Sequence, residues 1–172
     1  MRLIEVVSKE LPWNGDPEIG WWQEAKPLYM YHGSNLQNVQ SIMQTGLSRP
    51  DPTTGMISLA FEPNTAYGYA SMGGGESNFR AAGAKPKHVE GNQRAIIVLK
   101  FANGLADLKA LHFDTNLGGN LGKERQRLTS KAMYDQWVTA HSHDDQGYYQ
   151  LAEIRIPKLV PPKYIVGYMQ KR

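Results

Sequence analysis

Cysteine is absent from this chain of 172 residues. Its absence excludes disulfide bridges, thiolate metal sites and a cysteine nucleophile. The first residues, Met1 to Glu5, lack the apolar core of a secretion signal, and no apolar run approaches roughly 18 residues. We therefore expect neither a signal peptide nor a membrane-spanning helix, and a cytoplasmic protein without a membrane partner.

Charge is also sparse: charged residues make up 20% of the sequence, and the formal net charge is +3. Such a mildly basic chain can accept a nucleic-acid or other anionic partner but does not require one. Hydrophobic residues make up 41% of the chain, and no internal repeat is visible. These features predict one domain over residues 1–172 with a buried core. We expect it to be a monomer.

The pattern of apolar residues predicts more strands than helices. The strongest strand is Ala95 to Phe101, which we expect to be central. Ser34 or Asn35 is expected to cap a helix that Gly46 ends. The other expected elements are strands at 2–7, 28–31, 56–61, 151–156 and 163–169, helices at 63–70 and 124–140, an irregular Trp- and Pro-rich segment at 1–27 and a long loop, either functional or mobile, at 72–94. Many strands with few helices favour an α+β domain.

Polar and aromatic residues stand beside the predicted strands. The run Tyr31-His32-Gly33-Ser34 closes the strand that begins at Leu28, and Tyr67-Gly68-Tyr69 ends the short helix after the second strand. Glu153 begins a late strand. Polar residues spaced in this way can line a cleft for a dinucleotide, so the arrangement indicates chemistry on NAD.

The same residues carry a resemblance to a known family. The His-Gly-Ser run, the helix end Ile42-Met43-Gln44-Thr45-Gly46-Leu47, the strand Gly55 to Phe61, Tyr69 and Glu153 occur in an order similar to that of ADP-ribosyltransferases of the PARP-like, diphtheria-toxin-like branch. The resemblance covers about residues 28–70, 95–101 and 148–169. It implies two packed, mostly antiparallel sheets around an NAD cleft, with short flanking helices.

The resemblance also implies an activity. The chain would be a mono-ADP-ribosyltransferase that moves one ADP-ribose unit from NAD to a macromolecular acceptor and releases nicotinamide. NAD would be a substrate, no metal would be needed, and the acceptor would be a protein or a nucleic acid. An effector or phage protein of this kind would act in the host cytoplasm.

Roles for individual residues follow from the resemblance. Glu153 would stabilise the positive charge that develops on the ribose, and His32 would donate a hydrogen bond to a ribose hydroxyl. Gly33 would present its backbone to the nicotinamide carboxamide, and Tyr69 would stack on the nicotinamide ring. The predicted cofactor-binding set is His32, Gly33, Ser34, Thr65, Tyr67 and Tyr69. Taken singly, a histidine at a strand end is more often a structural hydrogen-bonding residue, so the hypothesis depends on the whole pattern.

Position 58 departs from the pattern of this branch. Ser58 stands where the branch has a tyrosine on its second strand, which makes the predicted catalytic triad His32, Ser58 and Glu153. Loss of that tyrosine argues against polymer synthesis. Leu151 stands two residues before Glu153, where arginine-modifying members of the other large branch carry Glu or Gln. The departure bears on the acceptor more than on the cofactor.

The segment 141–149 lies just before the strand that presents Glu153. In this family such a segment recognises the acceptor, so His143, Asp145 and Tyr148 are predicted to contact it. The same segment holds a His-x-His-x-Asp spacing, at His141, His143 and Asp145, which is seen in metallo-β-lactamase-like hydrolases. Those sites need further histidines downstream, and none follows His143. A two-histidine, one-carboxylate metal site is the competing hypothesis.

Two other functions stay open. An RNA 2′-phosphotransferase has the same fold and a similar His-Gly motif, but it uses an arginine after the short helix, where this chain has Tyr69-Ala70-Ser71. The second alternative is a non-catalytic domain that binds NAD or a partner without turnover.

Overall fold

The computed structural model describes residues 9–15, 27–48, 55–70, 90–117 and 151–172, together with positions 132 and 136, and leaves out the side chains of 115–117 and 151–153. Its strands are β1 (Glu10–Leu11), β2 (Leu28–Asn35), β3 (Ile57–Ala60), β4 (Arg94–Phe101), β5 (Asp114–Leu117), β6 (Leu151–Ile156) and β7 (Ile165–Met169). Its helices are α1 (Val39–Thr45), α2 (Pro63–Ala70) and α3 (Leu105–Ala110), with 3₁₀ turns η1 (Leu36–Asn38), η2 (Gly91–Gln93) and η4 (Pro162–Tyr164). None of the described helices is long and apolar enough to span a membrane.

The described strands form one seven-stranded sheet in the order β1-β7-β4-β2-β3-β6-β5. Only β1 and β7 pair in parallel, and the other neighbours are antiparallel. Few helices and a mixed sheet confirm the α+β class. The expectation of two separate packed sheets is wrong for the described residues, because β2 and β3 connect the two halves through a backbone pair.

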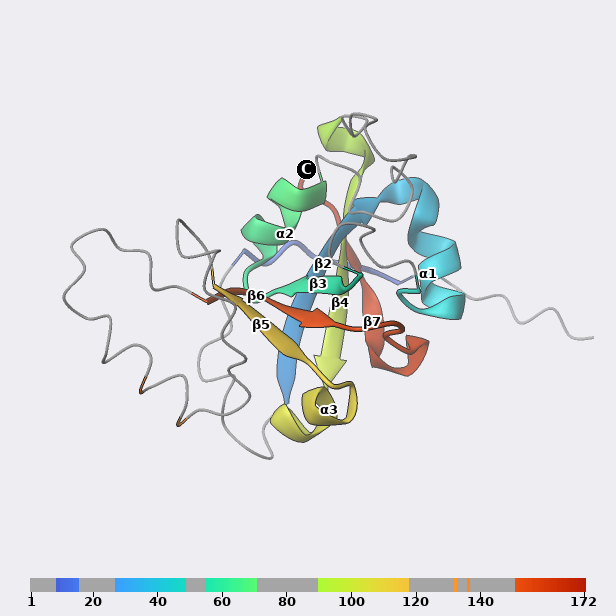
Figure 1. Cartoon of the computed structure of the whole chain (residues 1–172). Helices are drawn as coiled ribbons and strands as arrows, with labels where there is room; N and C mark the ends of the chain where they lie inside the picture. The colour runs from blue at the N-terminus through green and yellow to red at the C-terminus, as the bar shows by residue number, and fades with distance from the viewer. Residues whose placement is uncertain are drawn as a thin grey trace, which may run out of the picture.

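That connection is narrow. β2 pairs with β4 along all eight of its residues, whereas it pairs with β3 only at Tyr31 and Ala60. Past this pair the two strands diverge, and β3 and β6 run across the direction of β2 and β4 (Figure 1). The right-handed twist of strands favours such a crossing when so few residues hold two neighbours together. The sheet therefore behaves as two crossed halves that meet at Tyr31 and Ala60.

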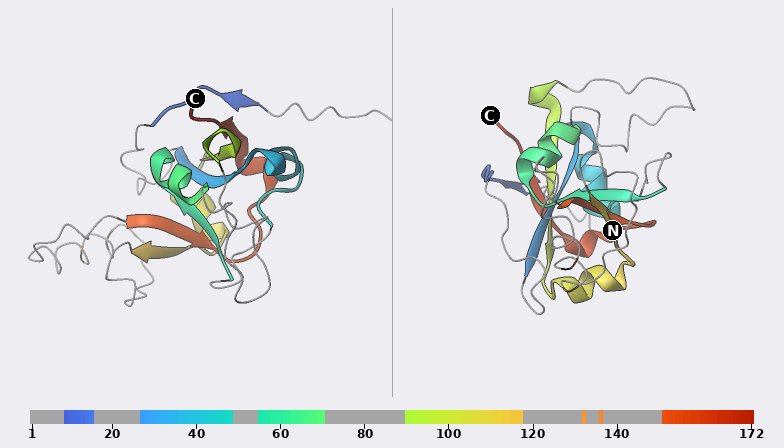
Figure 2. Two further views of the ribbon diagram at one scale, coloured as in Figure 1. Left: turned by 90° about the horizontal axis from the view of Figure 1, so that it is seen from above. Right: turned by 60° about the vertical axis from the view of Figure 1, so that its left-hand side comes forward.

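Alternation along β4 builds a core on each face of the sheet. Ala95, Ile97, Leu99 and Phe101 enter one cluster, and Ile96 and Val98 enter the other. The first cluster includes residues of α1 and α3, and the second includes Ala66 and Ala70 of α2. α1 and α2 accordingly lie on opposite sides of β2 in Figures 1 and 2. β4, paired on both edges and covered on both faces, is an interior strand of the sheet next to the middle strand β2, close to the central place that its apolar sequence predicts.

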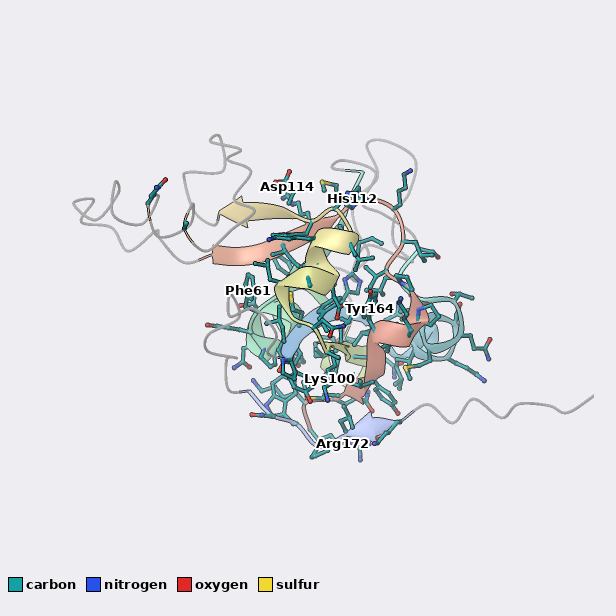
Figure 3. All side chains as sticks on the ribbon, turned by 90° about the horizontal axis from the view of Figure 1, so that it is seen from below. Phe61, Lys100, His112, Asp114, Tyr164 and Arg172 are labelled. Carbon is teal, nitrogen blue, oxygen red and sulfur yellow. The ribbon has the colours of Figure 1, made fainter. Side chains whose placement is uncertain are left out.

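The first core also receives the chain after β6. Phe101 and Tyr164 lie with their ring centroids 4.9 Å apart, and Figure 3 shows Tyr164 near α3. Leu47 and Val160 join the two chain segments by an isolated antiparallel bridge. The segment between β6 and η4 is thereby fixed to the segment that follows α1.

The predicted ends of α1 are present. Asn35 accepts a hydrogen bond from the backbone N–H of Asn38 at 3.2 Å, so it caps the 3₁₀ turn that leads into α1. Gly46 ends α1 with φ of +81°, a conformation that favours glycine. A side chain at position 46 would also meet the carbonyl oxygen of Val160. The sequence predicted the end at Gly46 correctly, and the predicted cap Asn35 belongs to the 3₁₀ turn before α1.

Other elements differ from expectation. β2 continues to Asn35, so His32, Gly33 and Ser34 lie inside a strand and not after its end, because β4 pairs with them along the whole run. The strand expected at 163–169 begins with the turn η4, and β1, α3 and β5 were not predicted. The strand expected at 2–7, the helix expected at 124–140 apart from two of its positions, and most of the 72–94 loop lie outside the described residues.

Candidate functional site

The three predicted triad positions lie on three neighbouring strands. β2 carries His32, β3 carries Ser58, and β6 carries Glu153, in the sheet order β2-β3-β6. Ala60 pairs with Tyr31 on one side and with Glu153 on the other, and Ser58 pairs with Arg155. Cα atoms of such antiparallel partners are about 5 Å apart. Segments far apart in sequence therefore meet at the point where the two halves of the sheet cross.

An irregularity in β6 lies directly beside Glu153. Asn116 of β5 pairs with Glu153, but Leu117 pairs with Leu151, so Ala152 is an extra residue on β6. A bulge of this kind bends its strand and redirects the chain locally, and bulges are common next to active sites. The backbone of Glu153 thus lies at a bend of β6. It is in register with Ala60, which in turn pairs with Tyr31.

His32 is the best-defined polar residue of the site. Its side chain is 7% exposed, and its Nδ1 atom lies 2.8 Å from the carbonyl oxygen of Ser58. A carbonyl oxygen only accepts, so Nδ1 carries the proton and donates. In the neutral ring the buried Nε2 atom then has a lone pair and can accept. The predicted contact between His32 and a ribose hydroxyl stays a prediction; with a neutral ring it would use Nε2 as the acceptor, an atom that is buried in this structure.

The bond from His32 replaces part of the strand ladder. Counting on from the Tyr31–Ala60 pair, Gly33 would be the backbone partner of Ser58, but no such pair forms. The imidazole instead reaches the carbonyl oxygen of Ser58 where the strands have separated. Because the contact uses the backbone of position 58, it does not depend on a serine side chain there. The half-buried hydroxyl of Ser58 is a separate feature of the site.

Gly33 has a packing role. A Cβ atom at this position would lie 2.1 Å from the carbonyl oxygen of Ala66 and 2.6 Å from the backbone nitrogen of Ala70. Glycine therefore lets α2 lie directly against β2. The predicted contact between Gly33 and a carboxamide is a further role that this packing neither requires nor tests.

Ser34 was predicted to bind the cofactor, but its side chain is 0% exposed. It lies on β2 two residues after His32, on the strand face that also carries Met30. Like the Nε2 atom of His32, the Ser34 hydroxyl can contact a ligand only if the residues that cover it move. Ser34 therefore belongs to the interior that supports His32.

The predicted residues of α2 fall into two groups. Thr65 and Tyr69 are four residues apart and share one side of the helix, and Tyr69 is 37% exposed. Tyr67 lies about 200° around the helix from Thr65, since each residue turns it by about 100°. Its ring contacts Trp13 and Arg94. Thr65 and Tyr69 can therefore serve one ligand, and Tyr67 faces different neighbours.

A row that contains two charged residues was not predicted from the sequence. Arg155 pairs with Ser58 on one side and with Asp114 on the other, and both charged side chains are half-buried. The signal was present in the strand Glu153-Ile154-Arg155-Ile156, because residues two apart on a strand share a face. Pairing between strands places this row next to the one that contains Glu153.

The acceptor residues His143, Asp145 and Tyr148, and His141 of the competing metal motif, lie outside the described residues. Within the parts of the chain that are described, no group of three or more His, Cys, Asp or Glu side chains could hold a metal ion.

No protein-family model matches the chain, and no curated protein matches it either.

Proposed function

We propose that this protein is a mono-ADP-ribosyltransferase that transfers one ADP-ribose unit from NAD to a macromolecular acceptor. The observation that carries the proposal is the order β2-β3-β6, which brings His32, Ser58 and Glu153 to one crossing of the sheet. Their order along the chain resembles the ADP-ribosyltransferase pattern, and Ser58 is the position that departs from the PARP-like branch. The anchored imidazole of His32 supports the same interpretation, because a fixed ring can orient a ribose.

The reaction breaks the bond between the ribose C1′ and the nicotinamide nitrogen. The electron pair of this bond leaves with nicotinamide, so positive charge develops on the ribose ring. The carboxylate of Glu153 would stabilise that charge and hydrogen-bond a ribose hydroxyl. A lone pair of the acceptor then forms the new bond to C1′, and the proton that the acceptor loses passes to Glu153 or to water.

His32 and Tyr69 would hold different parts of the dinucleotide, because His32 lies on the β2 face of the first core and α2 packs on the other face. With Nδ1 bound to the Ser58 carbonyl oxygen, the ring plane of His32 is set and Nε2 can accept from one hydroxyl only. Tyr69, exposed on α2, offers a flat face for the nicotinamide ring. Thr65 on the same side of α2 can hydrogen-bond the carboxamide. These contacts orient NAD and need no metal.

Replacement of Glu153 by Gln tests the catalytic role. The amide keeps the size of the side chain but removes its charge, so release of nicotinamide should fall by about two orders of magnitude or more. NAD affinity measured by calorimetry and the melting temperature should both stay close to wild type. Glu90→Gln, at an exposed position before η2, is the matched control and should keep full turnover. Unchanged nicotinamide release in Glu153→Gln would overturn the proposal.

The acceptor can be identified with labelled NAD. Incubation with a cell lysate should transfer the label to a macromolecule, and digestion with protease or nuclease then shows whether it is protein or nucleic acid. Replacement of His143, Asp145 and Tyr148 by alanine should abolish this transfer and spare the slow hydrolysis of NAD. Metal analysis is the counter-test, since zinc lost in His143→Ala would return the segment to the metal hypothesis.

The row that contains Arg155 favours a second candidate, the RNA 2′-phosphotransferase activity. That activity needs arginines around a phosphate, and pairing between strands puts Arg155 beside Ser58 and one row from Glu153. An RNA oligonucleotide with a 2′-phosphate, incubated with NAD, distinguishes the two activities. Loss of the 2′-phosphate that depends on NAD and on Arg155 would select this candidate over transfer to the lysate acceptor.

A further inference from the structure

A second group of side chains lies on the other side of α2. It consists of Trp13, Tyr67, Arg94 and Lys171, which we call the aromatic–cation corner. The segment after β1, the helix α2, the first residue of β4 and the chain after β7 each contribute one member. β1 and β7 pair in parallel, and the pair lies close to the C-terminus (Figure 2). Four segments distant in sequence are thus brought to one place.

The two rings of the corner are held edge to face. The centroids of Trp13 and Tyr67 are 6.1 Å apart, with ring planes at 74°. Both rings are half-buried at the border of the second core, so part of each remains accessible. A Cβ atom at Gly91 would lie 3.1 Å from the Tyr67 hydroxyl oxygen, which shows how closely the backbone of η2 approaches this ring. The two rings together form one platform.

Two cations lie over this platform. The guanidinium carbon of Arg94 is 4.8 Å from the Tyr67 centroid. The Lys171 ammonium is 5.3 Å from the Tyr67 centroid and 5.5 Å from that of Trp13. A cation above a ring gains attraction from the ring quadrupole, which fixes the position of a long side chain.

Lys171 is held by neutral groups. Besides the two rings, its ammonium lies 3.4 Å from the Asn64 side-chain oxygen, and the residue is exposed. By contrast, the next residue, Arg172, is neutralised by Glu10 at 2.8 Å, and Figure 3 shows it beside β1. Partners without charge position the Lys171 ammonium and leave its charge available to an anion from solution. The corner therefore combines positive charge with accessible aromatic surface.

We propose that the aromatic–cation corner binds single-stranded nucleic acid. Proteins that bind single strands combine aromatic faces, on which bases stack, with cations that contact the phosphates. Trp13 would supply a stacking face, and Lys171 and Arg94 would contact the phosphate next to the stacked base. Duplex fits less well, because its bases are already stacked on each other and only its phosphates would reach the corner. This binding requires neither NAD nor Glu153, so it stands apart from the proposed transferase.

Fluorescence anisotropy with a labelled oligothymidylate of about 12 nucleotides, within the site size of such platforms, tests the proposal. The full chain should bind the strand more tightly than a duplex of the same length at low salt. Lys171→Gln should weaken binding several-fold and lower the slope of log affinity against log salt by about 1. Trp13→Leu should weaken binding roughly tenfold, which is the size of one lost base stack.

Lys163 provides the matched control. It is also an exposed lysine over a ring, 5.0 Å from the Tyr164 centroid, but that ring belongs to the first core. Lys163→Gln should bind the strand like wild type. The circular dichroism spectrum of Lys171→Gln should match that of wild type, because this exposed side chain lies outside both cores. A loss of binding in this variant would then not be due to unfolding. Absence of binding at low salt, equal loss in Lys163→Gln and Lys171→Gln, or equal affinity for duplex would each overturn the proposal.

Discussion

The two edges of β2 differ in how many of its residues pair with the neighbouring strand. One edge pairs with β4 from Leu28 to Asn35, and the residues along that boundary are almost all buried. The other edge pairs with β3 at Tyr31 only, and past that point a side chain, His32, replaces the backbone in reaching Ser58. The hydrogen bonds of a backbone ladder use groups that every residue except proline carries, whereas a side-chain bond depends on one residue. The candidate site lies on the edge where the ladder stops.

The difference separates stability from function along a single strand. Burial of the β4 edge stabilises the domain, since each large apolar side chain removed from water contributes about 1.5–3 kcal/mol. The β3 edge carries polar groups that must be oriented toward a ligand, and the separation of β2 from β3 leaves space for them. Substitutions at the β4 edge should therefore mainly change the free energy of unfolding, and substitutions at the β3 edge should mainly change NAD binding.

The largest expected effect is on folding, at Gly33. Gly33→Ala puts a methyl group against the backbone of Ala66 and Ala70, which neither helix nor strand can yield easily. We expect a loss of about 3 kcal/mol or more in the free energy of unfolding, measured with denaturant. Gly68→Ala on the same helix is the control, because nothing lies within 4 Å of a Cβ there. It should raise the unfolding free energy by about 0.5–1 kcal/mol, since alanine is the better helix residue. Equal stability of the two variants would show that α2 does not rest on β2 as described.

A smaller effect is expected at His32. Removal of the ring in His32→Ala leaves the Ser58 carbonyl oxygen without this donor and should cost about 1–3 kcal/mol of stability. It should also weaken NAD binding by about tenfold. Asparagine at position 32 separates the two losses, because its Nδ2 stands where Nδ1 does but nothing replaces Nε2. His32→Asn should recover most of the stability and none of the NAD affinity.

Ser58→Ala is the control for the contact between His32 and position 58. It keeps the carbonyl oxygen that His32 uses, so the unfolding free energy should stay within about 0.5 kcal/mol of wild type. Recovery of NAD affinity in His32→Asn would contradict the ligand role of Nε2, and a large loss of stability in Ser58→Ala would contradict the backbone contact.

Local signals in the sequence predicted much of the fold correctly. The apolar run of β4, the cap at Asn35 and the glycine at Gly46 each act through neighbours within a few residues. β1 was missed because two residues, Glu10 and Leu11, carry no periodicity, and their pairing with β7 is set by tertiary contact. β5 was missed because Asp114 and Asn116 are poor strand formers that pairing with β6 stabilises.

The site was predicted by residue type and order more than by geometry. The positions of His32, Ser58 and Glu153 in a pattern were legible, but sequence cannot show which atom of position 58 meets the imidazole. Nor could it show that α2 requires glycine at position 33, because Ala66 and Ala70 lie 33 and 37 residues further along the chain and meet Gly33 only through packing. Tyr67 and Tyr69 looked alike in sequence, and helix geometry separates them.

The smallest expected effect tests that separation on α2. Tyr69→Ala should raise the NAD dissociation constant roughly fivefold, which corresponds to about 1 kcal/mol for one lost aromatic stack. Tyr67→Ala should leave NAD affinity unchanged and weaken binding of the oligothymidylate, because its ring supports Arg94 and Lys171. Calorimetry with NAD and anisotropy with the oligonucleotide on both variants give four values. If both variants lose NAD affinity alike, the two sides of the helix serve one ligand. The division of α2 between a dinucleotide and a nucleic acid would then be wrong, because a shared loss means a shared site.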